Sequence, residues 1–158
     1  MFTGYFAKIK LYRDIGLIPI SIALFEPKFI KNIIRYKKLA PKMSFFYEWK
    51  SGSHKGDTEY YEKHFKKEVL DKLNPKKVVE YLEKITETKH QNIILLCWEN
   101  PNCFCHRHLV SKWLNDAGIE TKEFSSTSFR NKCNVTFSDD ILDWYYYNIG
   151  ISNERKTD

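Results

Sequence analysis

One short stretch holds most of the reactive side chains that occur close together in the chain. Residues 95–114 read LLCWENPNCFCHRHLVSKWL, with three cysteines, a glutamate, two histidines and an arginine between an apolar run and an amphipathic run. Thiols, imidazoles and carboxylates bind metals, act as nucleophiles or carry protons. We therefore take this stretch as the candidate site, with Glu99, Cys105 and His106 as candidate catalytic residues.

Metal binding is one interpretation of the stretch. Cys97, Cys103, Cys105 and His106 could supply four ligands, and zinc is the metal that would suit them. However, the spacing Cys-x5-Cys-x-Cys-His differs from zinc-finger arrangements, and no second cysteine pair follows at finger distance. The sequence therefore predicts no metal ligands and requires no cofactor, and zinc is the less favoured alternative.

A cysteine-dependent reaction is a second interpretation. Phosphatase and sulfurtransferase loops place a cysteine after a strand and an arginine a few residues later, where a helix starts. Here Arg107 follows Cys97 only after a longer loop, so that exact loop is absent. A different thiol reaction stays open, with Glu99 or His106 as the proton carrier.

Non-covalent recognition is a third interpretation, and it asks least of the sequence. Arg107 and the start of the following helix could hold a phosphate or carboxylate, while Glu99 accepts hydrogen bonds from a base or sugar. Cys97 and Asn100 would line the same pocket. A purely structural interpretation also stays open, in which Cys97 is a small buried residue at a strand end.

The elements around this stretch must position it. Residues 92–98 (NIILLCW) are apolar on both faces, as in a central parallel strand. Residues 105–117 predict a helix that ends at Gly118, and residues 119–124 alternate like a last strand. Ligands of open α/β sheets gather beyond the carboxyl ends of strands, which is where the candidate site would lie.

The rest of the chain alternates in the same way. Residues 17–24 predict a buried strand, residues 58–73 a helix, and Asn74-Pro75 the start of the next helix. We also expect a first helix capped by Thr3, a short helical piece around Phe29 to Ile34, and a polar loop at 51–57. The sequence therefore predicts an α/β fold: a single three-layer domain over residues 1–150, with a small, mostly parallel sheet flanked by helices, followed by a flexible tail at 151–158.

Charge and composition point to anionic partners. The chain has 158 residues and a net charge of +6, which favours a small anionic ligand, with nucleic acid as a further candidate. The segment from Lys28 to Lys42 has six cations and no acid, and aromatic residues lie in and after it. Such a surface can hold a phosphate backbone and stack bases. Its candidate binding residues are Lys28, Arg35 and Lys38.

The amino terminus lacks the apolar core of a signal peptide, and no run approaches the length that spans a bilayer. We therefore expect a cytoplasmic protein with no membrane association, whose four cysteines are reduced. The oligomeric state is left open.

At the 95–114 stretch the sequence resembles the family catalogued as domain of unknown function 488. The residues that match its motif in order are Cys97, Glu99, Pro101, Cys105, His106 and Arg107. The segments TGYFAKIK, PISIALFEP, YKKLAP and YEKHFKKEVLDKLNPKKVVEYLE also resemble one branch of that family, so the resemblance covers roughly residues 1–125. It implies a compact α/β fold and no settled activity. Members often have an arginine where this chain has Leu24 and Phe25, and Cys103 is an addition.

Together these features predict a cytosolic α/β protein with a pocket for a small anionic or nucleotide-like ligand. The resemblance leaves open whether it is an enzyme, which would act on nucleotides or nucleic-acid bases. The alternative is a non-catalytic module that binds nucleic acid or inhibits another protein through its basic, aromatic surface.

Overall fold

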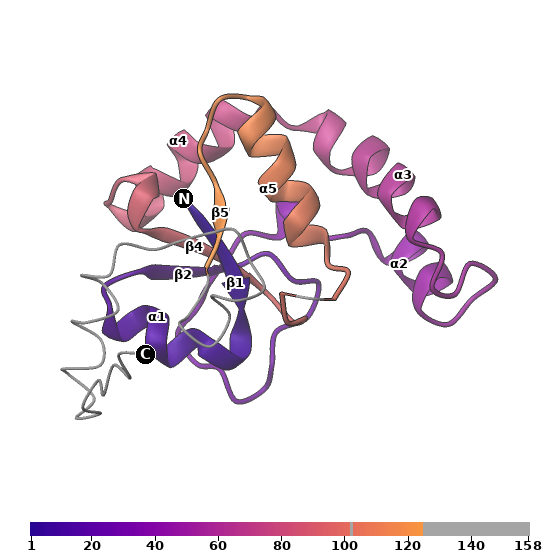
Figure 1. Cartoon of the computed structure of the whole chain (residues 1–158), viewed down its shortest axis with the longest axis horizontal. Coiled ribbons are helices and arrows are strands. Elements are labelled where there is room, and N and C mark those ends of the chain that lie inside the picture. The colour runs from indigo at the N-terminus through magenta and orange to yellow at the C-terminus, as the bar shows by residue number, and fades with distance from the viewer. Residues whose placement is uncertain (102, 125–158) are drawn as a thin grey trace, which may run out of the picture.

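The fold is built on a small parallel sheet. The computed structural model describes residues 1–101 and 103–124. Within them, parallel strands lie in the order β3-β2-β4-β1-β5 (Figure 1). Their bounds are β1 (Phe2–Tyr5), β2 (Ile18–Ser21), β3 (Ile34–Arg35), β4 (Ile93–Cys97) and β5 (Lys122–Glu123). The predicted α/β class is confirmed, and the described sheet is parallel throughout.

Strand β4 lies at the centre of the sheet, as predicted for residues 92–98. All five of its residues are buried, because β2 and β1 flank it and helices cover both of its faces. Ile93 and Leu95 belong to one apolar core, while Ile94 and Leu96 belong to a second core on the opposite face. This explains why β4 is a continuous apolar run rather than an alternating one.

Helices on both faces complete the three layers. Helix α1 (Ile9–Asp14) packs Leu11 and Tyr12 into the core that contains Ile94. The other face is covered by α2 (Met43–Lys50), α3 (Thr58–Glu68), α4 (Pro75–Thr86) and α5 (His106–Asp116) (Figure 1). Short 3-10 turns lie at Phe6–Lys8, Lys37–Leu39, Leu70–Lys72 and His90–Asn92.

Several helix boundaries follow local signals that the sequence carries. The Asn74 side chain accepts a hydrogen bond from the Lys77 backbone N–H at 3.1 Å, and Pro75 begins α4. Gly118 has a φ of +78° just after α5, a conformation that favours glycine. The predicted helix at 58–73 corresponds to α3 followed by the turn at Leu70–Lys72.

The predicted amino-terminal helix is wrong at its start. Residues 2–5 form β1, which pairs with both β4 and β5, and the Thr3 hydroxyl donates to Glu123 rather than capping a helix. Gly4 passes so close to α1 that a Cβ there would lie 2.6 Å from Tyr12 Oη. Pairing on both sides therefore overrides the helical spacing of the aromatic residues.

The short helical piece predicted around Phe29 to Ile34 is also wrong. This segment is irregular, Asn32 has a φ of +55°, and Ile34 pairs with Ile20 in edge strand β3. Because Ile34 and Arg35 pair with β2 at the edge of the sheet, this segment does not form the expected helix. Conversely, α2 was not predicted from sequence.

The predicted tail at 151–158, the boundary at residue 150 and the aromatic segment Trp144 to Tyr147 lie outside the described residues. No helix among those that the structure describes is long and apolar enough to cross a membrane.

Candidate functional site

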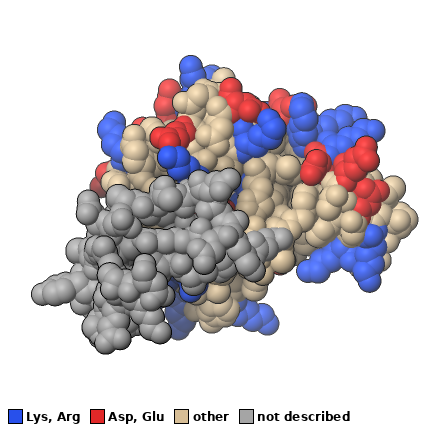
Figure 2. All heavy atoms as spheres, viewed as in Figure 1, with Lys and Arg blue, Asp and Glu red and all other residues tan. Residues whose placement is uncertain are grey.

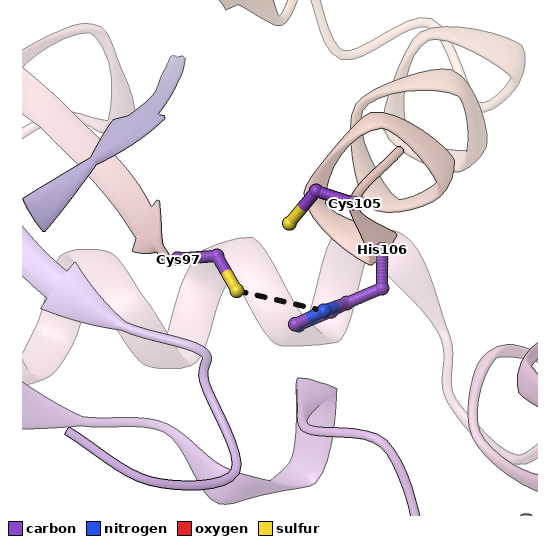
Figure 3. Close-up of side chains that lie close together, drawn as sticks. All are labelled: Cys97, Cys105 and His106. Atoms are coloured by element: carbon purple, nitrogen blue, oxygen red, sulfur yellow. Dashed lines mark hydrogen bonds between the residues drawn. The ribbon is translucent and has the colours of Figure 1, made fainter. Parts of the chain in front are cut away.

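The end of β4 and the start of α5 bring three reactive side chains together. Strand β4 ends at Cys97 and α5 begins at His106, with Cys105 at its N-cap position. The two sulfur atoms and a ring nitrogen of His106 all lie within 4.8 Å of one another, and Figure 3 shows them converging from the two elements. All three side chains are buried, with exposed fractions of 6%, 5% and 4%. We call Cys97, Cys105 and His106 the thiol–imidazole cluster.

The imidazole ring of His106 is held at both nitrogen atoms. Its Nε2 lies 2.9 Å from the Ile22 carbonyl oxygen, which can only accept, so Nε2 carries a proton and donates it. Its Nδ1 lies 3.7 Å from Cys97 Sγ (Figure 3). The ring therefore turns Nδ1 toward the sulfur atoms, and it packs against Phe65 with ring centroids 5.2 Å apart.

The two thiols titrate as a tightly coupled pair with opposite shifts. A hydrogen bond from Cys97, together with the neighbouring His106 ring and the Arg107 guanidinium, holds the pKa of Cys105 well below its ordinary value although burial opposes this. The pKa of Cys97 lies well above its ordinary value because of the hydrogen bond to Cys105 and because of burial. Cys105 is therefore the sulfur that favours the thiolate form.

A pocket of about 580 Å³ opens above the cluster, beyond the carboxyl ends of neighbouring strands β2 and β4. The cluster forms part of its wall. Aromatic side chains make up much of the rest, namely Phe25, Phe46, Trp49, Tyr61, Trp98 and Phe104. Lys50, Lys55 and Glu99 supply its charged groups.

Trp49 stands out among the aromatic residues. Its indole Nε1 is buried and has no hydrogen-bond partner among the residues that the structure describes. Its ring packs against Tyr61 and Phe104, with centroids 5.0 Å and 5.7 Å away. A buried N–H donor without an acceptor costs free energy, so an acceptor that reached this donor would relieve that cost.

The candidate residues in the loop between β4 and α5 differ in their position relative to the pocket. Glu99 is exposed and lines the pocket, so its carboxylate can reach a ligand. Asn100 is exposed and does not line the pocket; its carbonyl accepts from the Cys103 backbone N–H. Cys103 is exposed and lies outside the thiol–imidazole cluster.

Arg107 is fully buried, with an exposed fraction of 0%. Its Nε and Nη2 atoms donate to the Glu123 carboxylate, the latter at 2.9 Å, and Nη1 donates to the Glu99 carbonyl. Burial lowers the pKa of Arg107, but the Glu123 carboxylate more than offsets this, so the guanidinium stays charged. The predicted role of Arg107 as an anion clamp stays a prediction. The hydrogen bonds favour a structural role, in which Arg107 joins α5 to β5 and to the loop between β4 and α5.

The predicted basic residues lie away from the pocket wall. Lys28 and Lys38 are exposed, and Arg35 in β3 pairs with Glu26 at 3.4 Å. None of the three lines the pocket.

The cations that do line the pocket are Lys50 and Lys55, at the end of α2 and in the following loop. Sequence reasoning missed both. The sequence signal for them was one lysine just before and one lysine within the polar loop at 51–57, which follows an aromatic run.

A family model matches the part of the chain that contains the candidate site. Residues 20–118 match the family described as "Active DUF488-N3 subclade", which is well over half of the chain and includes β3, β4 and the cluster. The chain therefore belongs to the DUF488 family, and the resemblance seen at the Cys-His-Arg motif is confirmed. No curated protein and no solved structure matches the chain.

Proposed function

We propose that the pocket binds a small anionic ligand that carries a planar ring, such as a nucleotide, and acts on it at the thiol–imidazole cluster. The observation that carries this proposal is the position of Cys105 and His106 in the wall of a pocket lined with aromatic side chains and two lysines. Its volume, about 580 Å³, is typical of sites for small molecules and cofactors.

The aromatic lining supports a ring-shaped ligand. Flat apolar side chains such as Trp49 and Phe104 can stack against a base or pack against its edge. The unsatisfied indole N–H of Trp49 offers a donor to a ring nitrogen or carbonyl oxygen. The Glu99 carboxylate offers an acceptor to an amino group or a sugar hydroxyl.

The charged groups support an anionic ligand. Lys50 and Lys55 are exposed side chains on the pocket wall, where their ammonium groups can approach a phosphate without loss of an existing partner in a buried ion pair. Arg107 is committed to Glu123, so the anion-binding role passes to the lysines in this proposal.

The cluster supports a chemical role beyond binding. A thiol whose pKa is lowered next to an imidazole is the arrangement that activates a cysteine, and Glu99 is a candidate proton carrier. The description of the matched family as an active subclade also favours an enzyme over a module that only binds.

Thermal denaturation with a panel of nucleosides, nucleotides and dinucleotides tests the binding step. We expect some nucleotides to raise the Tm of the wild-type protein, and nucleosides without phosphate to do so less. Lys50→Ala combined with Lys55→Ala should weaken binding about tenfold, as expected if about 1.4 kcal/mol of binding energy is lost.

Lys38→Ala provides the matched control, because Lys38 is exposed and does not line the pocket. If no member of the panel raises the Tm, or if the double lysine variant binds as tightly as the Lys38→Ala protein, the pocket assignment is wrong.

A further inference from the structure

We propose that Cys97, Cys105 and His106 form a site for a zinc-like divalent metal ion, with one coordination position open to the pocket. The inference deepens the proposed function and rests on it in one respect, because it takes the pocket as the place where the ligand meets the metal. With a metal bound, Cys105 would serve as a ligand of the metal and not as a free nucleophile. The metal site itself can be tested without any ligand.

The donor geometry is close to what the metal requires. The three donor atoms lie within 4.8 Å of one another, and Cys97 Sγ lies 3.7 Å from His106 Nδ1. A tetrahedral zinc ion, with Zn–S of about 2.3 Å and Zn–N of about 2.0–2.1 Å, places its donors roughly 3.6–3.8 Å apart. Small rotations of the side chains would therefore complete the set.

The His106 ring is already oriented as a metal ligand. Its Nε2–H donates to the Ile22 carbonyl, which leaves the lone pair of Nδ1 facing the sulfur atoms (Figure 3). Histidine ligands commonly donate their other ring N–H to a carboxylate or backbone carbonyl, which fixes the tautomer and the ring orientation. The connection also ties the site to the segment that follows β2.

The burial of the donors also favours a metal. Two thiolates in the same buried place repel each other and lose their hydration, a cost that is large unless positive charge is present. A divalent ion neutralises both, and metal binding releases the thiol protons to solvent. The donor set of two sulfurs and one nitrogen suits zinc rather than magnesium or calcium, which prefer oxygen.

The number of protein ligands distinguishes structural from catalytic zinc sites. Structural zinc sites usually have four protein ligands, whereas catalytic sites have three and leave one position for water or substrate. The three donors found among residues 1–101 and 103–124 all line the pocket, so with these three as the protein ligands the remaining position would open toward a bound ligand. There a metal ion could polarise a ligand oxygen or lower the pKa of a bound water, with Glu99 within the same pocket as a proton carrier.

Cobalt substitution tests the site directly. We expect the chelator-treated wild-type protein to bind one Co²⁺ per chain, with visible absorption bands of a tetrahedral site and a thiolate-to-cobalt charge-transfer band, and Zn²⁺ to displace the Co²⁺. Cys97→Ser, Cys105→Ser and His106→Gln should each weaken binding by at least tenfold. Cys103→Ser is the matched control, because Cys103 lies in the same segment but is exposed and outside the cluster, and it should bind as wild type does.

A second measurement uses only the wild-type protein, in case a variant does not fold. Bound Zn²⁺ should protect Cys97 and Cys105 from alkylation, as read by mass spectrometry, and leave Cys103 reactive. Absence of the charge-transfer band, or equal alkylation of Cys97 and Cys105 with and without Zn²⁺, overturns the metal site. If the metal site fails these tests but nucleotides still stabilise the protein, the inference is wrong and the proposed function stands. If the metal binds but no panel member does, the metal site stands and the proposed function is wrong.

Discussion

Three consecutive residues at the start of α5 have different surroundings. Cys105 and His106 face Cys97 and the pocket, whereas Arg107 turns away from the pocket and reaches Glu123 in β5. On a helix, adjacent residues point about 100° apart, so one turn can serve both the site and the sheet. The Cys-His-Arg motif therefore joins two side chains of the thiol–imidazole cluster to one buried cation that pairs with β5.

Removal of the Arg107 charge should destabilise the fold strongly. We expect Arg107→Met to lower the free energy of unfolding by about 3 kcal/mol, because it leaves the Glu123 carboxylate, 14% exposed, without its partner. Urea denaturation measures the change. The double variant Arg107→Met with Glu123→Met should recover much of the loss, because no unpaired charge remains.

Lys112→Met is the control on the same helix. Its ion pair with Asp116 is exposed on both sides, so its loss should change stability by less than about 0.5 kcal/mol. An Arg107→Met protein as stable as the Lys112→Met protein would show that the buried pair has no structural role.

At the residue scale, the sequence predicted the members of the cluster but not their neighbours. Cys97, Cys105 and His106 are close in the chain, and a strand followed by a helix brings them together. Lys50 and Trp49 come from about fifty residues earlier, and only the packing of α2 beside the site loop brings them there. Glu123, the partner of Arg107, was likewise invisible without the pairing of β1 and β5.

At the scale of elements, the carboxylate of Glu26 holds the segment after β2 in position. Glu26, whose side chain is 11% exposed, accepts from Ser21 and Lys37 and pairs with Arg35. These contacts hold the end of β2 against β3 and the turn at Lys37–Leu39. The same segment contains Ala23, Leu24 and Phe25 of the pocket wall and the Ile22 carbonyl that orients His106.

We expect the contribution of Glu26 to disappear in acid. Burial raises the pKa of Glu26, but hydrogen bonds from Lys37 and Ser21 and the nearby cations outweigh it, so the pKa lies below the ordinary value of 4.5. A carboxylate whose pKa is lowered by folding contributes stability that is complete above 4.5 and is lost as the pH falls through the folded pKa.

The measurement compares the wild-type protein with Glu26→Gln by urea denaturation from pH 7 downward. The difference in unfolding free energy between them should be constant at neutral pH and shrink once the pH falls below about 4.5, the ordinary carboxyl pKa. A difference that grows in acid would contradict the assigned sign.

The elements that sequence predicted well are those with strong local signals. Strand β4 is a continuous apolar run, and α4 has the Asn74 cap and Pro75. The elements that it missed depend on partners far along the chain. Residues 2–5 have helical spacing but occupy the position between β4 and β5, and β3 is two residues long and exists only beside β2.

At the scale of the molecule, the described part of the surface drawn in Figure 2 has charges of both signs. On the face drawn in Figure 2, basic and acidic side chains alternate over the helices, and two cations of the basic segment, Arg35 and Lys37, pair with Glu26. The net charge of +6 still attracts polyanions, but such a surface offers few aligned contacts to a phosphate backbone.

We therefore expect nucleic-acid binding to be weak and not specific for sequence. Fluorescence anisotropy with labelled single-stranded DNA and RNA should show binding at low salt that falls steeply and is lost near physiological salt. Binding that persists at about 0.2 M salt and differs between sequences would instead favour the alternative of a nucleic-acid-binding module.

The position of β1 has a consequence for how the chain is made. Phe2 pairs with Ile94 and with Lys122, so β1 is synthesised long before the strands that it pairs with. Helices α3 and α4 can form while β1 and β2 still lack the central strand β4 that joins them. Pairing between such distant segments slows folding, and it leaves apolar strand edges open during synthesis. Folding during translation thus waits for the segment from Ile93 to Glu123, the same segment that contains the reactive cysteines.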